Sequence, residues 1–118
     1  MTELMGLRVL VVEDEPIVAM CLEDILETLG CVAVGPAGRL SEGLALAQDA
    51  AIDAAILDIN LGGERSTAIA SMLRARGVPF AFASGYGSAP EGFADEVPLI
   101  EKPYREGDID AVLRALVR

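Results

Sequence analysis

The sequence lacks histidine and tryptophan, and it has only two cysteines. Without histidine and without a Cys-x-x-Cys pair, it lacks the usual ligands of a structural zinc site. Cys21 and Cys31 both fall inside apolar segments, so we expect both to pack in the core of a protein from a reducing compartment. Aromatic residues make up only 4% of the chain and hydrophobic residues 53%. The core must therefore consist mainly of Ala, Val, Leu and Ile, as is typical of buried parallel strands covered by helices.

Basic residues are also scarce, with 9 Lys and Arg against 19 Asp and Glu and a net charge of -10. This balance argues against direct binding of nucleic acid, which depends on Lys and Arg to neutralise phosphates. Apolar runs of membrane-spanning length and the basic start of a signal peptide are both missing. We expect a cytoplasmic protein that neither binds nucleic acid directly nor enters a membrane.

The length of 118 residues is that of a single domain, which we expect to cover residues 1–118 without an attached output domain. Short apolar runs alternate with stretches of helical periodicity along the whole chain. Strands are expected at residues 7–12, 32–34, 54–57, 79–83 and 99–100. This alternation predicts a flavodoxin-like doubly wound α/β fold, (βα)5, with a parallel five-stranded sheet in the order 2-1-3-4-5.

Acidic residues directly follow two of the expected strands: Glu13 and Asp14 the first, Asp58 the third. These strands are neighbours in the expected order, so the carboxylates should converge at the carboxyl edge of the sheet. Such hard oxygen ligands suit Mg²⁺. Two plainer interpretations remain open: Glu13 and Asp14 could favour the start of the next helix, and Asp58 could begin the turn at 60–63.

Two more polar residues end strands that reach the same edge. Lys102, the only lysine in the chain, follows the last strand, and Ser84 ends the fourth. An ammonium group beside carboxylates can bind a phosphoryl oxygen as a point charge, and the serine hydroxyl can offer a second hydrogen bond. Taken alone, each residue also fits a plainer role, as a solvated lysine or a loop serine beside Gly85.

Together these motifs resemble the receiver domain of bacterial two-component response regulators across essentially the whole chain. The resemblance lies in Val-Val-Glu-Asp-Glu-Pro at 11–16, Leu-Asp-Ile-Asn-Leu at 57–61, Ala-Ser-Gly-Tyr at 83–86 and Glu-Lys-Pro-Tyr at 101–104. The stretch 82–86 is similar to a subgroup with Phe-Ala-Thr-Gly-Tyr, known largely as stand-alone receivers.

The resemblance implies a role for each of these residues. Asp58 becomes the phosphoacceptor, and Glu13, Asp14, Asp58 and the backbone carbonyl of Asn60 become ligands of Mg²⁺. Ser84 and Lys102 become the pair that senses the phosphoryl group. The donor would be a phosphohistidine on a histidine kinase or a histidine phosphotransfer protein, and phosphorylation would switch binding to an unidentified downstream protein. Such a domain is not an enzyme beyond phosphorylation and dephosphorylation of its own Asp58.

The chain departs from many receivers at Leu99, in the loop Leu-Gly-Gly-Glu at 61–64, which replaces the commoner Pro-Gly turn, and at Phe80 and Phe82, where many receivers have aliphatic residues. Leu99 replaces the aromatic residue that often lies three positions before the lysine, so a switch based on that side chain is not expected. Glycine and proline are frequent between Ser84 and Leu99, which predicts a fourth helix that is short, displaced or mobile. We further expect a cis Lys102–Pro103 bond. When a phosphoryl group binds Ser84 and orders residues 86–93, we expect Tyr86, Phe93 and Tyr104 to offer aromatic surface to a partner.

Two other classes of function deserve comparison. A phosphatase of the haloacid-dehalogenase type also uses an aspartyl nucleophile and Mg²⁺, but its nucleophile belongs to an Asp-x-Asp motif on the first strand, whereas Asp58-Ile59-Asn60 follows the third. A non-phosphorylated interaction module could keep the fold. The intact acids, Asp58 and Lys102 speak against that alternative.

Overall fold

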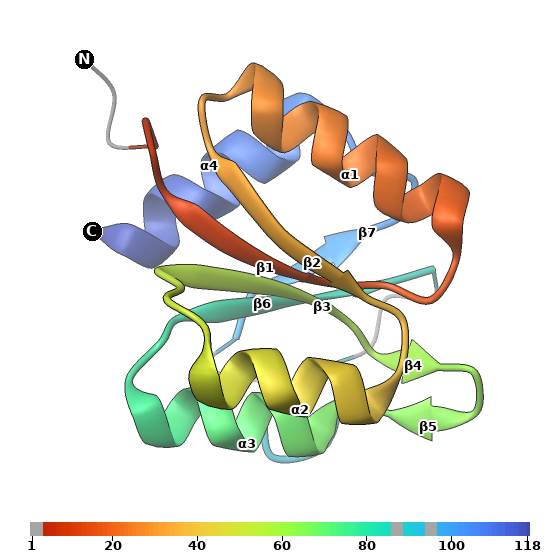
Figure 1. Cartoon of the computed structure of the whole chain (residues 1–118). Coiled ribbons are helices and arrows are strands. Elements are labelled where there is room, and N and C mark those ends of the chain that lie inside the picture. The colour runs from red at the N-terminus through yellow and green to blue at the C-terminus, as the bar shows by residue number, and fades with distance from the viewer. Residues whose placement is uncertain (1–3, 86–88, 94–96) are drawn as a thin grey trace.

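The computed structural model describes residues 4–85, 89–93 and 97–118. The described part forms a five-stranded parallel sheet between two pairs of helices (Figure 1). The strands of this sheet are β1 (Arg8–Val12), β2 (Val32–Ala37), β3 (Ala54–Asp58), β6 (Phe80–Ser84) and β7 (Leu99–Glu101). Their order, β2-β1-β3-β6-β7, confirms the predicted order 2-1-3-4-5 when the five strands are counted along the chain.

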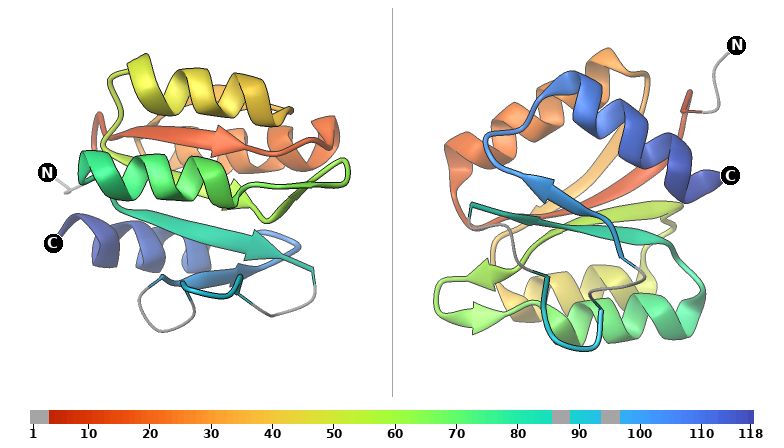
Figure 2. Two further views of the ribbon diagram at one scale, coloured as in Figure 1. Left: turned by 90° about the horizontal axis from the view of Figure 1, so that it is seen from below. Right: turned by 180° about the vertical axis from the view of Figure 1, so that it is seen from behind.

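The helices cover both faces of the sheet, as a succession of right-handed crossovers requires (Figures 1 and 2). One face carries α1 (Pro16–Thr28) and α4 (Glu106–Val117), and the other carries α2 (Leu40–Asp49) and α3 (Thr67–Arg76). Pro16 is the first residue of α1, where a backbone N–H would have no acceptor within the helix, so the missing N–H of proline costs no hydrogen bond. At the C-terminal end of α3, Gly77 has a φ of 74°, the left-handed conformation that commonly ends a helix.

Two hydrophobic clusters fill the space between the sheet and the helices. Strand residues alternate between them, so Leu10 packs toward α2 and α3 whereas Val9 packs toward α1 and α4. The α2/α3 cluster contains three phenylalanines whose ring centres lie 5.4 to 6.1 Å apart in edge-to-face contacts, namely Phe80, Phe82 and Phe93. The other cluster is mostly aliphatic, as the composition predicts.

A small hairpin after β3 was not predicted. It pairs β4 (Asn60–Leu61) with β5 (Glu64–Arg65), and its turn consists of Gly62 and Gly63 with φ values of 57° and 96°. Two consecutive left-handed residues give the tight turn whose twist suits a two-residue hairpin, and glycine adopts that conformation without strain. The hairpin extends from the carboxyl edge of the sheet (Figure 1).

The segment between β6 and β7 differs from the five βα repeats of the prediction. Its described residues form a turn at 91–93 and no helix, so the described chain contains four helices. No helix in the described ranges is both long and apolar enough to cross a membrane.

The prediction for the two cysteines is half right. Cys31 is buried, but Cys21 is exposed. The residues of α1 that face the core are Ala19, Leu22 and Leu26, and Cys21 lies off this stripe. The apolar residues of α1 are spaced so that either of two helix faces could pack against the sheet. In the structure the face with Ala19, Leu22 and Leu26 packs there, and the face with Cys21 does not.

Candidate functional site

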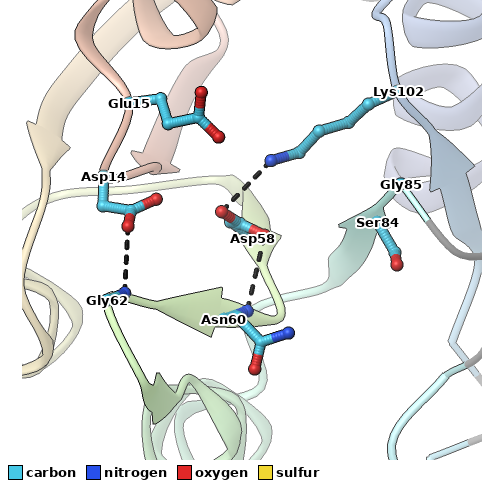
Figure 3. A pocket seen from close by; sticks show the side chains of 8 residues that line it. All are labelled: Asp14, Glu15, Asp58, Asn60, Gly62, Ser84, Gly85 and Lys102. Atoms are coloured by element: carbon cyan, nitrogen blue, oxygen red, sulfur yellow. Dashed lines mark hydrogen bonds and ion pairs between the residues drawn. The ribbon is translucent and has the colours of Figure 1, made fainter.

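The carboxyl edge of the sheet contains a cleft of about 430 Å³ (Figure 3). Its lining residues are Asp14, Glu15, Asp58, Asn60, Gly62, Ser84, Gly85 and Lys102. The strand register explains their meeting, because Val12 pairs with Leu57 on β3. Asp58 on β3 likewise pairs with Ala83 on β6. The polar residues at or just beyond the ends of these strands therefore lie together at the carboxyl edge of the sheet.

Three carboxylates gather at this edge of the sheet: Asp14 and Asp58 line the cleft, and Glu13 is buried next to them. Glu13, Asp14 and Asp58 each place one carboxylate oxygen within 4.8 Å of the others. Backbone N–H groups hold them: Gly62 N donates to Asp14 Oδ2 at 2.9 Å, and Asn60 N lies 3.4 Å from Asp58 Oδ1. The glycine hairpin thus orients one of the acids. An all-oxygen donor set beside an open cleft fits Mg²⁺, which keeps several waters when protein carboxylates bind it.

Lys102 extends its ammonium group into the acids from the end of β7 (Figure 3). Its Nζ lies 2.7 Å from Glu13 Oε1 and 3.1 Å from Asp58 Oδ2. Burial opposes the charge of Lys102, but its hydrogen bonds to Glu13 and Asp58 outweigh burial and raise its pKa. The lysine therefore stays cationic at neutral pH. The Lys102–Pro103 bond is cis, which confirms the prediction.

Asp58 is a buried carboxylate in an unfavourable setting. Burial and the neighbouring negative charge of Glu13 raise the pKa of Asp58 to about 6, although Lys102 acts in the opposite direction. Lys102 offsets this increase only in part, because its ammonium group contacts both Glu13 and Asp58. A buried carboxylate with incomplete compensation is the kind of group that a cation would stabilise.

Ser84 and Asn60 also lie at the cleft, as predicted. The carbonyl oxygen of Ser84 accepts a hydrogen bond from Lys102 N at 3.1 Å, which ties the ends of β6 and β7 together. Figure 3 shows the Ser84 hydroxyl turned away from Asp58. Its role in sensing a phosphoryl group, and the role of the Asn60 carbonyl as a metal ligand, stay predictions.

Tyr104 was missed as a member of the site. Its hydroxyl donates to Glu13 Oε1 at 3.4 Å, and burial together with the Glu13 charge raises the pKa of the phenol. Its position directly after Lys102-Pro103 was the available signal. Phe93 and Tyr104 are each 7% exposed in this structure, so the aromatic surface predicted for the phosphorylated state stays a prediction. Tyr86 lies outside the described residues.

Comparison with known proteins gives a consistent answer. A family model described as "Response regulator receiver domain" matches residues 9–114. The chain is 34% identical over 117 residues to the phyllosphere-induced regulator PhyR of Methylorubrum extorquens, covering 92% of this chain and 43% of that protein. The chain therefore spans less than half the length of this relative.

Two solved structures resemble the whole chain. The solution structure of SdrG from Sphingomonas melonis Fr1 is 44% identical, covers 100% of both chains and has a TM-score of 0.85. A second solution structure, of the BeF3-activated conformation of SdrG from Pseudomonas melonis Fr1, is 42% identical with a TM-score of 0.79, and the match covers 99% of this chain and 100% of that one.

Proposed function

This chain belongs to the response regulator receiver domain family, and from that membership we propose that Asp58 is the phosphoacceptor of a switch driven by a phosphohistidine donor. The family places the chain in two-component signalling as a phosphoacceptor receiver. The observation that carries the assignment to Asp58 is its position in the cleft, close to the acids Glu13 and Asp14 and 3.1 Å from the ammonium group of Lys102. We extend the proposal to residues 1–118 as one receiver domain and to a cytoplasmic location.

In the proposed reaction, a carboxylate oxygen of Asp58 attacks phosphorus. A P–O bond forms as the P–N bond to the donor imidazole breaks, and the electron pair of that bond stays on the imidazole. Mg²⁺, held by Glu13, Asp14, Asp58 and the Asn60 carbonyl, would supply positive charge to the phosphoryl oxygens. Lys102 adds a second cation from the opposite side of the cleft, and Ser84 offers a hydroxyl to the phosphoryl group after a change of rotamer.

The partners that fit this proposal are a histidine kinase or histidine phosphotransfer protein and a downstream protein that binds the phosphorylated form. Exposed apolar side chains of α1 lie on the segment that follows the acids: Ile17 is 81% exposed and Met20 60%. They offer a surface on which a donor protein could rest beside the cleft. Turnover of small phosphate esters, the sign of a haloacid-dehalogenase-type phosphatase, is not part of the proposal, because Asp58 follows the third strand of the sheet rather than the first.

Intact-mass analysis with acetyl phosphate and Mg²⁺ tests the assignment. We expect the wild-type chain to gain one phosphoryl mass and Asp58→Asn to gain none. Asp49→Asn, at the exposed end of α2, is the matched control and should behave as wild type. Equal phosphorylation of Asp58→Asn and wild type would overturn the assignment, and an unmodified wild type would count against a phosphoacceptor role altogether.

A further inference from the structure

Tyr104 lines an apolar groove and also reaches the acids at the carboxyl edge of the sheet through its hydroxyl. The groove has a volume of about 400 Å³ and is lined by Ile17, Val18, Cys21, Lys102, Pro103 and Tyr104. The ring is nearly buried, and its hydroxyl reaches Glu13 Oε1 at 3.4 Å. Tyr104 therefore contacts the cleft through a single polar atom, and packing fixes the position of that atom.

Glu13 depends on such donors because its side chain is completely buried. Water cannot orient this carboxylate, and a buried carboxylate without hydrogen bonds is strongly unfavourable. Within the described part of the chain, Glu13 Oε1 accepts from Lys102 Nζ at 2.7 Å and from the Tyr104 hydroxyl, whereas Oε2 faces Glu15 N at 3.3 Å. Hydrogen bonds from Lys102 and Tyr104 thus both orient Oε1 of Glu13.

This inference rests on the proposed function, in which Lys102 also binds the phosphoryl group. The ammonium group that lies 2.7 Å from Glu13 must also reach a phosphoryl group on Asp58. Lys102 has a flexible four-carbon stem and can move, whereas the buried ring of Tyr104 cannot follow. As Lys102 turns toward the phosphoryl group, the phenol hydroxyl is the donor that stays on Oε1.

We propose that Tyr104 is a positioning residue that holds the Glu13 carboxylate in the orientation needed for Mg²⁺, with or without the help of Lys102. The role is that of an outer partner that orients a ligand by a hydrogen bond, and such partners commonly change metal affinity when they are removed. Tyr104 itself touches neither the phosphoryl group nor the metal.

Titration calorimetry with MgCl2 on Tyr104→Phe tests the proposal. We expect the Mg²⁺ dissociation constant to rise about tenfold, as is typical for loss of an outer hydrogen bond to a ligand. At saturating Mg²⁺, the rate of phosphorylation by acetyl phosphate should stay near the wild-type rate, since Asp58 and Lys102 are unchanged. Cys21→Ala alters the same groove without removing the phenol and should leave Mg²⁺ affinity unchanged.

The same substitution in a Glu13→Ala background separates positioning from a general packing effect. Because the hydroxyl acts through Glu13, Tyr104→Phe should change Mg²⁺ affinity no further once Glu13 is absent. An equal loss in both backgrounds, or no loss in Tyr104→Phe alone, would overturn the role of Tyr104 while leaving Asp58 as phosphoacceptor. A wild-type chain that binds no Mg²⁺ and accepts no phosphoryl group would instead overturn both proposals.

Discussion

The faces of the sheet and its carboxyl edge both bury side chains, but the buried side chains differ in chemistry. On the faces, residues such as Leu57 and Phe82 are 0% exposed and belong to a hydrophobic cluster. At the edge, Glu13 is 2% exposed and Asp58 7%. Burial of apolar surface stabilises a fold by about 25 cal/mol per Å², whereas burial of a charge destabilises it unless a partner compensates.

The apolar faces of the sheet therefore stabilise the fold, whereas the buried charges at the carboxyl edge destabilise it. The site places Glu13, Asp14 and Asp58 beside one ammonium group, that of Lys102, so negative charge exceeds positive charge there. That excess makes the cleft unfavourable when empty and favourable for a cation. Substitutions at equally buried positions should therefore change stability in opposite directions, and the variants below test this from the largest effect to the smallest.

Phe82→Ala should cause the largest change. Phe82 is fully buried and lies 5.6 Å from the ring of Phe80 and 5.4 Å from that of Phe93. Truncation removes its apolar contacts and leaves a cavity, so we expect a loss of about 3–5 kcal/mol in the free energy of unfolding. Urea denaturation followed by circular dichroism measures it. Ile17→Ala, at an 81% exposed position, is the control and should change stability by less than about 0.5 kcal/mol.

Lys102→Ala removes the cation that contacts both buried acids, Glu13 and Asp58. Two carboxylates then face each other without compensation, and we expect a loss of about 2 kcal/mol at pH 7, less than for a fully buried pair because Lys102 is 17% exposed. Mg²⁺ affinity should stay the same or increase, since the acids attract a cation more strongly without the lysine.

Calorimetry and urea denaturation of Lys102→Ala measure the two effects. Arg114→Ala is a suitable control because Arg114 forms a surface pair with Asp110 at 2.8 Å, which should contribute no more than about 0.5 kcal/mol. Weaker Mg²⁺ binding by Lys102→Ala would contradict the view that lysine and metal compete for the same negative charge.

Asp58→Asn should stabilise the protein at neutral pH in the absence of Mg²⁺. The pKa of Asp58 is raised from 3.8 to about 6, so the folded state binds the proton more tightly than the unfolded state. Wild-type stability must then fall as pH rises through this window. The neutral Asn avoids that loss, and we expect a gain of about 1–2 kcal/mol at pH 7, below the roughly 3 kcal/mol that two pKa units would give without relaxation.

Urea midpoints of wild type and Asp58→Asn between pH 3.5 and pH 7.5 measure this difference. The gain should shrink below pH 6 and become small near pH 3.5, where Asp58 is protonated in the folded state and mostly protonated in the unfolded state. Phe82→Ala has no titrating group and should show the same loss at every pH. A stability difference for Asp58→Asn that does not change with pH would mean that the carboxylate is not the cause.

The same contrast explains how much of the molecule the sequence predicts. Strand order and the meeting of Asp58 with Lys102 follow from local signals, because apolar runs mark the strands and polar residues mark their ends. The hairpin at Gly62 and Gly63 depends on a backbone conformation that the residue types permit but do not impose. The exposure of Cys21 and the burial of Tyr104 depend on which face of an element packs, and only the assembled core decides that.

The smallest effect is expected at Ser66, a fully buried polar residue at the start of α3. Its hydroxyl is completely buried and finds no hydrogen-bond partner among the described residues, and it forms no side-chain cap on α3 although Ser66 is the N-cap residue. Ser66→Ala therefore removes a desolvated group without breaking a bond, and we expect stability to rise by at most about 1 kcal/mol. Ser71→Ala, exposed on the same helix, reports the gain from helix propensity alone. A loss of about 1 kcal/mol in Ser66→Ala would show instead that the hydroxyl binds a buried water or caps the helix in solution.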